Sequence, residues 1–230
     1  MKTRKQYILI ALLAALTACS SIHTGSRTDS YNLSRQERAE GYEILFDGTD
    51  LSQWTSHTNE YFVEDGCIVM RPSGGGHGNL YSKKEYDDFI LRFEFLLTPG
   101  ANSGLGLRHK MVTTASGYDG MELQILDNPA PEYANLKPYQ YHGSLYGWVP
   151  AKRGFLKPTG EWNYQEVIAR GSHITIRLNG TTILDTDIRE VLKDVPEDKI
   201  PRTLLYQKGH IVFLGHNSVL QFRNIRVREL

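Results

Sequence analysis

The stretch "SGLGLRHKMVTTASGYDGMELQILD", residues 103–127, decides the fold class because both of its ends alternate in the manner of β-strands. Leu105 and Leu107 occupy one side of the first alternation, and Met121, Leu123 and Ile125 occupy one side of the second. If the intervening loop joins two antiparallel strands, residues opposite each other point to the same side of the sheet. The sequence therefore predicts a hairpin with one apolar face in a core and one open face.

The open face of this predicted hairpin carries polar groups and glycines. Asn102, Gly104, Gly106 and Arg108 share it in the first strand, and Glu122 and Gln124 share it in the second. We expect Arg108 to lie roughly opposite Glu122, either as part of a binding site or as a structural ion pair between strands. Glycine inside a strand often marks a close approach to the backbone, by a ligand or by a crossing loop.

The rest of the chain shows further short alternations and few helical patterns. Residues 88–98, "DFILRFEFLLT", place phenylalanines and leucines on one face, and residues 173–185, "HITIRLNGTTILD", indicate a hairpin with a tight Asn-Gly turn. A change of parity near Arg223-Asn224 indicates a bulge. The best helical candidate is short, at 187–194. These features predict an all-β sandwich or barrel.

The N-terminus resembles a bacterial export signal. "MKTRKQYILIALLAALTACSS" combines a basic start, an apolar run and small residues, and "LTAC" resembles a lipobox. We expect residues 1–18 to be a lipoprotein signal peptide and Cys19 to be lipidated, with an ordinary signal peptide cut nearby as the alternative. Residues 19–41 would form a polar tether with a short helical turn near Ser34, and residues 42–230 a single domain.

This interpretation places the protein in the cell envelope, in the periplasm or at the outer membrane, attached to the membrane through the lipid anchor only. Loss of the signal removes three basic residues and leaves 23 basic against 26 acidic ones, a net charge of −3. Because nucleic-acid binding needs clustered Lys and Arg, no nucleic-acid partner is expected. Cys67 is the other cysteine, so no intrachain disulfide is expected if Cys19 is lipidated.

A third segment, "YHGSLYGW" at 141–148, repeats the polar alternation with His142, Ser144 and Tyr146. The region between 118 and 148 is also rich in tyrosine and ends in Trp148. Aromatic rings stack on the apolar faces of sugars, while amides, charged groups and histidines bond to hydroxyls. These residue types together favour an oligosaccharide or glycoside as the partner.

Seven motifs occur in an order that resembles the 3-keto-disaccharide hydrolase family: "ILFDGTDLSQW" (44–54), "ANSGLGLRH" (101–109), "GYDGMELQILDN" (117–128), "GSLYG" (143–147), "GEWN" (160–163), "LNG" (178–180) and "FRNIRVREL" (222–230). The resemblance implies a concanavalin-A-like jelly roll of two curved antiparallel sheets, with a sugar site on the concave face. One stretch departs from the family pattern. In "FLGHNS", Leu214 stands where glutamine is expected and Asn217 where glycine is expected, while His216 keeps its place, which puts the substrate preference in doubt.

The resemblance implies glycosides whose C3 hydroxyl has been oxidised to a ketone. The ketone acidifies the C2 hydrogen, a base removes it, and the C1 substituent departs, with water adding later. The expected catalytic residues are Glu122, Asp127 and His142, and His216 is a further candidate base. A divalent cation could supply the electrophile, although no HxH or HExxH spacing supports one. The expected substrate-binding residues are Asn102, Arg108, Gln124, Tyr146, Trp148 and His216.

Two other functions remain open at this level. A non-catalytic carbohydrate-binding module can use the same jelly roll, since a fold does not fix a function. A conventional glycosidase needs two carboxylates flanking one bond. Several candidate residues also have plain structural interpretations: Asp127 can begin a turn before Pro129, His142 can be a surface histidine, and His216 can be a histidine bonded between strands.

Overall fold

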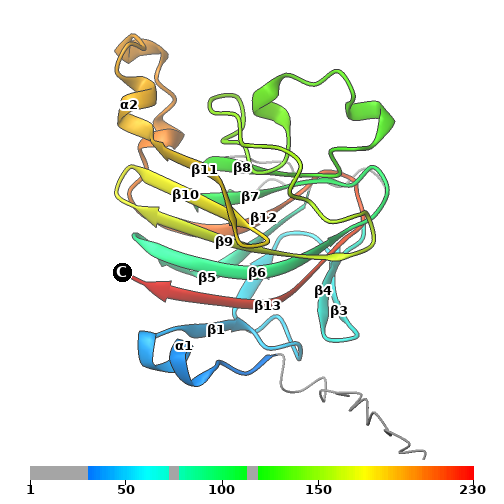
Figure 1. The fold of residues 1–230 in the computed structure, drawn as a ribbon. Coiled ribbons are helices and arrows are strands. Elements are labelled where there is room, and N and C mark those ends of the chain that lie inside the picture. Colours follow the sequence, from blue (N-terminus) through cyan, green and yellow to red (C-terminus); the bar gives the residue numbers. More distant parts are fainter. Residues whose placement is uncertain (1–30, 73–77, 113–118) are drawn as a thin grey trace, which may run out of the picture.

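The computed structural model describes residues 31–72, 78–112 and 119–230 as two antiparallel sheets packed face to face (Figure 1). The eight-stranded sheet has the order β11-β10-β9-β6-β13-β4-β3, with β1 also paired to β13, and the five-stranded sheet has the order β2-β5-β12-β7-β8. This is a jelly-roll sandwich, so the predicted all-β class is confirmed.

The eight-stranded sheet contains β1 (Glu43–Phe46), β3 (Tyr61–Glu64), β4 (Cys67–Met70), β6 (Phe89–Leu97), β9 (Trp162–Arg170), β10 (His173–Leu178), β11 (Thr181–Asp187) and β13 (Leu220–Glu229). The five-stranded sheet contains β2 (Trp54–Ser56), β5 (Asn79–Tyr86), β7 (Asn102–His109), β8 (Met121–Leu126) and β12 (Gly209–Gly215). The described helices are α1 (Arg35–Glu40), α2 (Ile188–Leu192) and four short 3₁₀ helices, η2 (Pro131–Tyr133), η3 (Pro138–Gln140), η4 (Glu197–Lys199) and η5 (Arg202–Leu205). No helix among the described residues is long and apolar enough to cross a membrane.

The core fills the space between the sheets because each strand buries alternate residues. In β6 the buried residues alternate with partly exposed ones along the whole strand. Phe213 of β12 stacks on Phe222 of β13 with ring centroids 3.9 Å apart, and Phe93 packs edge-on against Phe213 at 5.7 Å. The two sheets therefore meet through aromatic rings contributed by central strands of each.

The short-range predictions for β10–β11 and β13 are confirmed. Asn179 and Gly180 join β10 to β11 with φ of 50° and 88°, the left-handed conformations that a tight two-residue hairpin turn requires. In β13 the register with β6 shifts between Arg223 and Arg226, and Asn224 has φ of 56°. This is the bulge that the change of parity predicts.

The described end of the predicted tether, residues 31–41, packs on the domain. Ser34 caps α1 through a reciprocal bond with Glu37, as the predicted turn near Ser34 requires. Both carboxylate oxygens of Glu37 accept bonds from Arg226 Nη1 of β13, at 2.9 and 2.8 Å. The signal peptide, Cys19 and residues 20–30 lie outside the described residues, so those predictions stay predictions.

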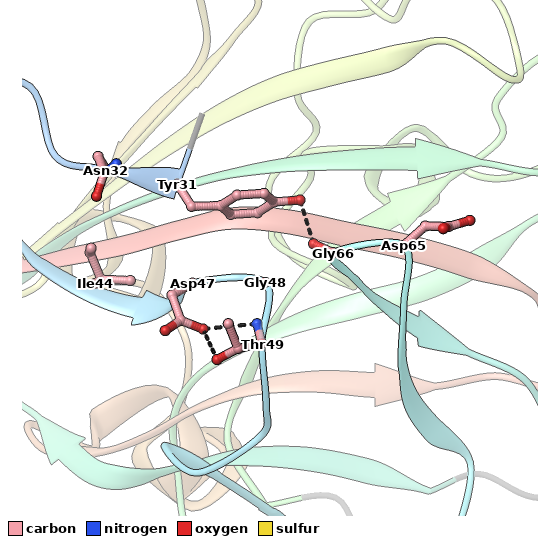
Figure 2. Close-up of a pocket in the computed structure, with 8 residues that line it drawn as sticks. All are labelled: Tyr31, Asn32, Ile44, Asp47, Gly48, Thr49, Asp65 and Gly66. Atoms are coloured by element: carbon pink, nitrogen blue, oxygen red, sulfur yellow. Dashed lines mark hydrogen bonds between the residues drawn. The ribbon is translucent and has the colours of Figure 1, made fainter. Parts of the chain in front are cut away.

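Tyr31, the first described residue, lies across two turn glycines (Figure 2). Its hydroxyl donates a hydrogen bond to the carbonyl of Gly66, and its ring is 3.1 Å from the place where a Cβ on Gly48 would stand. The side chain borders a cavity of about 540 Å³, in which Asp47 accepts bonds from the backbone and hydroxyl of Thr49. These polar contacts in the cavity therefore belong to turns and to docking of the N-terminal segment.

The candidate site depends on the long connection between β8 and β9, residues 127–161, which we call the excursion. Its first part, with η2 and η3, forms the irregular green segment above the strands in Figure 1. It then returns along β8, where Gly143 N donates to Gln124 O at 2.8 Å and Tyr146 N donates to Glu122 O at 3.0 Å. The excursion thus continues the hydrogen bonding of the five-stranded sheet beyond its last strand.

Candidate active site

A cavity of about 230 Å³ lies between the outer face of β7–β8 and the excursion. Three of its walls come from separate parts of the chain: the strand pair, the excursion, and the turn that follows β12. Its lining residues are Asn102, Glu122, Gln124, Leu126, Tyr133, Leu136, Gln140, Tyr146 and His216. The structure thus brings together five predicted site residues, Asn102, Glu122, Gln124, Tyr146 and His216.

Glu122 reaches across the neighbouring strand because Gly104 leaves room for it. A Cβ placed on Gly104 would stand 2.3 Å from Glu122 Oε1, so the carboxylate occupies the space that a side chain would fill. Glu122 Oε1 then lies 3.5 Å from Nε2 of His216, just past the end of β12. The predicted close approach at this glycine is therefore made by a neighbouring side chain.

Two amides lie beside this pair on the same face. Gln124 Nε2 donates to Asn102 Oδ1 at 2.7 Å, and the Gln124 side chain is buried. The register explains the contact, since Gly104 is the residue opposite Gln124 and Asn102 is opposite Leu126. Amides held in this way offer both donors and acceptors to hydroxyl groups of a ligand.

The wall opposite the strands comes from the excursion, and sequence reasoning assigned little of it. Leu136 and Gln140 of the excursion are not predicted to line a site, nor is Leu126 at the end of β8, and Tyr133 is expected only as part of a tyrosine-rich region. Tyr133 Oη donates to the carbonyl of Gly100 at 2.9 Å, which ties η2 to the turn before β7. Because the 3₁₀ turns η2 and η3 have three residues each, they are too short to show a hydrophobic period, and the tyrosine-rich composition is the signal that the sequence carries here.

The prediction for Arg108 is wrong about the residue that lies opposite it in the sheet and about the direction in which its side chain points. Gly106, and not Arg108, lies opposite Glu122. Arg108 lies at a bulge and has φ of 54°. Its buried guanidinium donates to the backbone carbonyls of Asp87, at 2.9 Å, and Gly171, at 2.7 Å. It also forms an ion pair with the carboxylate of Asp88 at 3.0 Å. Arg108 therefore holds connecting turns together, away from the cavity.

His109 takes the place on the open face that Arg108 was expected to fill. Cβ atoms placed on Gly106 and Gly120 would stand 2.6 and 1.8 Å from its ring, so both glycines make room for it. Burial lowers the pKa of His109 to about 4, although a hydrogen bond with the carbonyl of Met121 opposes the shift. The ring is neutral near pH 7 and lies outside the lining of the cavity.

Asp127 and His142, expected to be catalytic, are held in structural hydrogen bonds instead. Asp127 accepts bonds from Gly100 N at 2.9 Å and from the hydroxyl of Thr159 at 2.8 Å. His142 lies in the core, where its ring contacts Gln165 at 3.0 Å and burial lowers its pKa to about 4. Neither residue lines the cavity, so neither enters the proposal below.

Two further expectations concern Trp148 and a metal ion. Trp148 packs against the main hydrophobic core and does not line the cavity. Within the described part of the chain, no group of three or more His, Cys, Asp or Glu side chains is arranged to hold a metal ion. The cavity itself offers one carboxylate and one imidazole from its described residues.

The departures from the family pattern near His216 have structural consequences. Asn217 has φ of 58°, a conformation that asparagine adopts more readily than most residues other than glycine. Leu214 is buried with Tyr81 and Val212 in a second apolar cluster on the five-stranded sheet. The turn that presents His216 therefore keeps a backbone conformation that suits glycine or asparagine.

The fold and site define a jelly-roll protein with a small pocket that one carboxylate, one imidazole, amides, tyrosines and leucines line. Over residues 41–228 the chain matches the 3-keto-alpha-glucoside-1,2-lyase-like domain, and it belongs to this family. It is 30% identical to the 3-keto-disaccharide hydrolase of Bacteroides thetaiotaomicron, an alignment that covers 84% of this chain and 79% of that protein.

Solved structures from Parabacteroides distasonis share the fold. One candidate glycosyl hydrolase superposes with a TM-score of 0.76 at 22% identity, covering 87% of this chain and 99% of the other. A second superposes with a TM-score of 0.69 at 27% identity, covering 82% and 99%. The family resemblance expected from the ordered motifs is confirmed, and it establishes a carbohydrate-active, glycoside-acting protein at the level of the family.

Proposed function

We propose that the cavity cleaves 3-keto-glycosides, with Glu122 as the base that removes the C2 proton. The observation that carries the proposal is the Glu122 carboxylate, which lies over Gly104 and 3.5 Å from His216 in the cavity wall. At about 230 Å³ the cavity is below the ~300–1,000 Å³ typical of pockets for drug-sized ligands and suits one pyranose ring. The family's name supports the substrate class.

The chemistry needs a base and an acid that exchange roles. Glu122 takes the proton from C2, the electrons of that bond form the enolate of the neighbouring ketone, and the C1–O bond breaks as the enolate collapses. His216 is the general acid in this proposal and gives a proton to the departing oxygen. The proton on Glu122 then passes to His216 across 3.5 Å and restores both groups, and addition of water to the unsaturated sugar completes hydrolysis.

The two alternative functions have less support from the site. Of the described residues that line the cavity, Glu122 is the one that carries a carboxylate, whereas a conventional glycosidase uses two. A carbohydrate-binding module has no need for a carboxylate facing an imidazole beside the ligand. The arrangement of Glu122 and His216 therefore favours proton transfer at one sugar ring.

A matched pair of substrates tests this proposal. A 3-keto-disaccharide should be cleaved and its unoxidised parent left intact, as measured by mass spectrometry of the products. Glu122→Gln, which keeps the side-chain shape, should lower turnover about 10²-fold or more, the usual size for a positioned base. Glu161→Gln, at an exposed position in the turn before β9, is the control and should keep full turnover.

Two results would contradict the proposal in different ways. Equal cleavage of both disaccharides would support a conventional glycosidase. Binding of the ketone without cleavage by the wild-type protein would support a carbohydrate-binding module. In either case Glu122→Gln should be checked for an unchanged melting temperature, so that loss of folding is separated from loss of chemistry.

A further inference from the structure

The amide of Gln140 has a fixed orientation, although its side chain lies in the partly exposed wall of the cavity. The backbone N–H of Lys137 donates to Gln140 Oε1 at 3.0 Å. A backbone N–H can only donate, so the atom that faces it must be the amide oxygen. The other amide atom is therefore Nε2, and it lies 3.0 Å from the hydroxyl of Tyr146.

This orientation determines the polarity of the hydrogen bond to Tyr146. An amide nitrogen can only donate, so Tyr146 Oη is the acceptor and its own hydrogen is not used in the bond. Tyr146 and Gln140 both line the cavity, and Tyr146 is 41% exposed. The phenolic hydrogen is consequently available to an oxygen atom of a ligand in the cavity.

Tyr146 is also the neighbour of Glu122 in the extended sheet. Its backbone N–H donates to the Glu122 carbonyl at 3.0 Å, so the two residues reach the cavity from backbone positions that one hydrogen bond joins. In a 3-keto sugar the C2 hydrogen and the C3 ketone are on neighbouring ring carbons. A base and a hydrogen-bond donor placed side by side match these two groups.

We propose that Gln140 is a positioning residue that holds Tyr146 as the hydrogen-bond donor to the ketone oxygen of the substrate. This inference rests on the proposed function, because it assigns the group that stabilises the enolate formed when Glu122 removes the C2 proton. A donor aimed at an oxygen that gains charge in the transition state acts mainly on kcat.

An isosteric change reverses the hydrogen bond and so tests the proposal. In Gln140→Glu one carboxylate oxygen still accepts from Lys137 N, but the other accepts the phenolic hydrogen of Tyr146 and withdraws it from the substrate. We expect kcat on the 3-keto-disaccharide to fall by about 10²-fold, the lower end for loss of an oxyanion donor. KM should rise by a smaller factor, because the donor also bonds to the ketone of the bound substrate. Tyr146→Phe should cause a loss of similar size.

Two further variants separate this role from a structural one. Gln140→Met removes the bond without reversing it and leaves the hydroxyl free to donate, so it should lose much less activity than Gln140→Glu. The double variant Gln140→Glu, Tyr146→Phe should be no worse than Tyr146→Phe alone, because both changes remove one donor. Wild-type kcat in Gln140→Glu, or losses that multiply in the double variant, would overturn the proposal.

The affinity for the 3-keto-disaccharide, measured by calorimetry, keeps this test separate from the failure of the proposed function. If the wild-type protein binds the ketone but does not cleave it, the catalytic proposal fails while the donor remains measurable. Weaker binding in Gln140→Glu and Tyr146→Phe than in Gln140→Met would then support the donor role. Equal affinities in all four proteins would overturn it.

Discussion

Gly104 is the residue on which the position of the proposed base depends. A Cβ at this site would stand 2.3 Å from Glu122 Oε1 and 2.9 Å from Cδ, too close for both to remain. Because Glu122 Cγ would also stand 2.9 Å from this Cβ, the whole side chain must shift, and Gly104→Ala should move the carboxylate away from His216 at some cost in stability. We expect turnover of the 3-keto-disaccharide to fall at least tenfold, since misplacement of a base by about 1 Å can cost ~10²-fold.

Gly106→Ala is the matched control for that substitution. It lies on the same strand and face, but its Cβ would meet the buried ring of His109 at 2.6 Å and not Glu122. It should lower the melting temperature while activity per folded molecule is retained. Full activity in Gly104→Ala would mean that the Glu122–His216 contact has no role in turnover.

Arg108 shows what the sequence could not predict at the scale of one residue. The alternation predicts that Arg108 points to the same face of the sheet as Gly104 and Gly106. The structure follows the alternation up to Gly106. A bulge then gives Arg108 a positive φ and places His109 over the open face. Nothing in the local pattern marks this bulge, because the partners of Arg108 come from turns distant in the chain.

At the scale of elements, the strands were predictable and the walls of the cavity were not. Strand β6, the β10–β11 hairpin and the bulge in β13 follow from period-two alternation and turn chemistry, which act locally. The excursion at 127–161 is held by long-range bonds, such as Tyr133 to Gly100. Its contribution to the cavity therefore needs the tertiary structure.

His142 anchors the excursion and should make stability depend on pH. Its pKa is about 4 in the folded protein because of burial, against about 6.5 in an unfolded chain. The unfolded state therefore takes up a proton first, and stability falls as pH drops through 6.5 toward 4, by roughly 3 kcal/mol in total for this group. Urea unfolding between pH 4 and 8 measures the decrease.

A variant of His142 assigns this pH dependence. His142→Gln cannot titrate, so it should be less stable at pH 7 but should lose part of the slope below pH 6.5. His109, also with a pKa of about 4, would supply the remainder. An unchanged slope in His142→Gln would contradict the assignment.

At the scale of the whole molecule, the sandwich separates its N-terminal contacts from its cavity. Helix α1 and β1 lie at one end of the sandwich and the excursion lies at the other (Figure 1). Glu37 joins α1 to β13, and Tyr31 crosses the glycine turns at 48 and 66. The described N-terminal contacts therefore do not involve the residues that line the cavity.

The class of the molecule was predictable because many weak motifs agree in order over the whole domain. The roles of individual residues were less predictable. Glu122, Gln124 and His216 meet in one cavity. Asp127 and His142 instead make hydrogen bonds that hold the excursion. A carboxylate or imidazole in a polar motif looks the same in sequence whether it faces a ligand or a backbone amide. Only its partners in the fold distinguish the two.

Cleavage of a 3-keto-disaccharide in D₂O tests the central claim most directly, because removal of the C2 proton and later addition of water incorporate solvent deuterium into the product. The released keto sugar should carry one deuterium at C2, as seen by NMR or mass spectrometry, after subtraction of exchange in the sugar alone. Glu122→Gln should slow cleavage and labelling together. Rapid cleavage with protium retained at C2 would contradict the account, since the glycosidic bond would then break without C2 deprotonation.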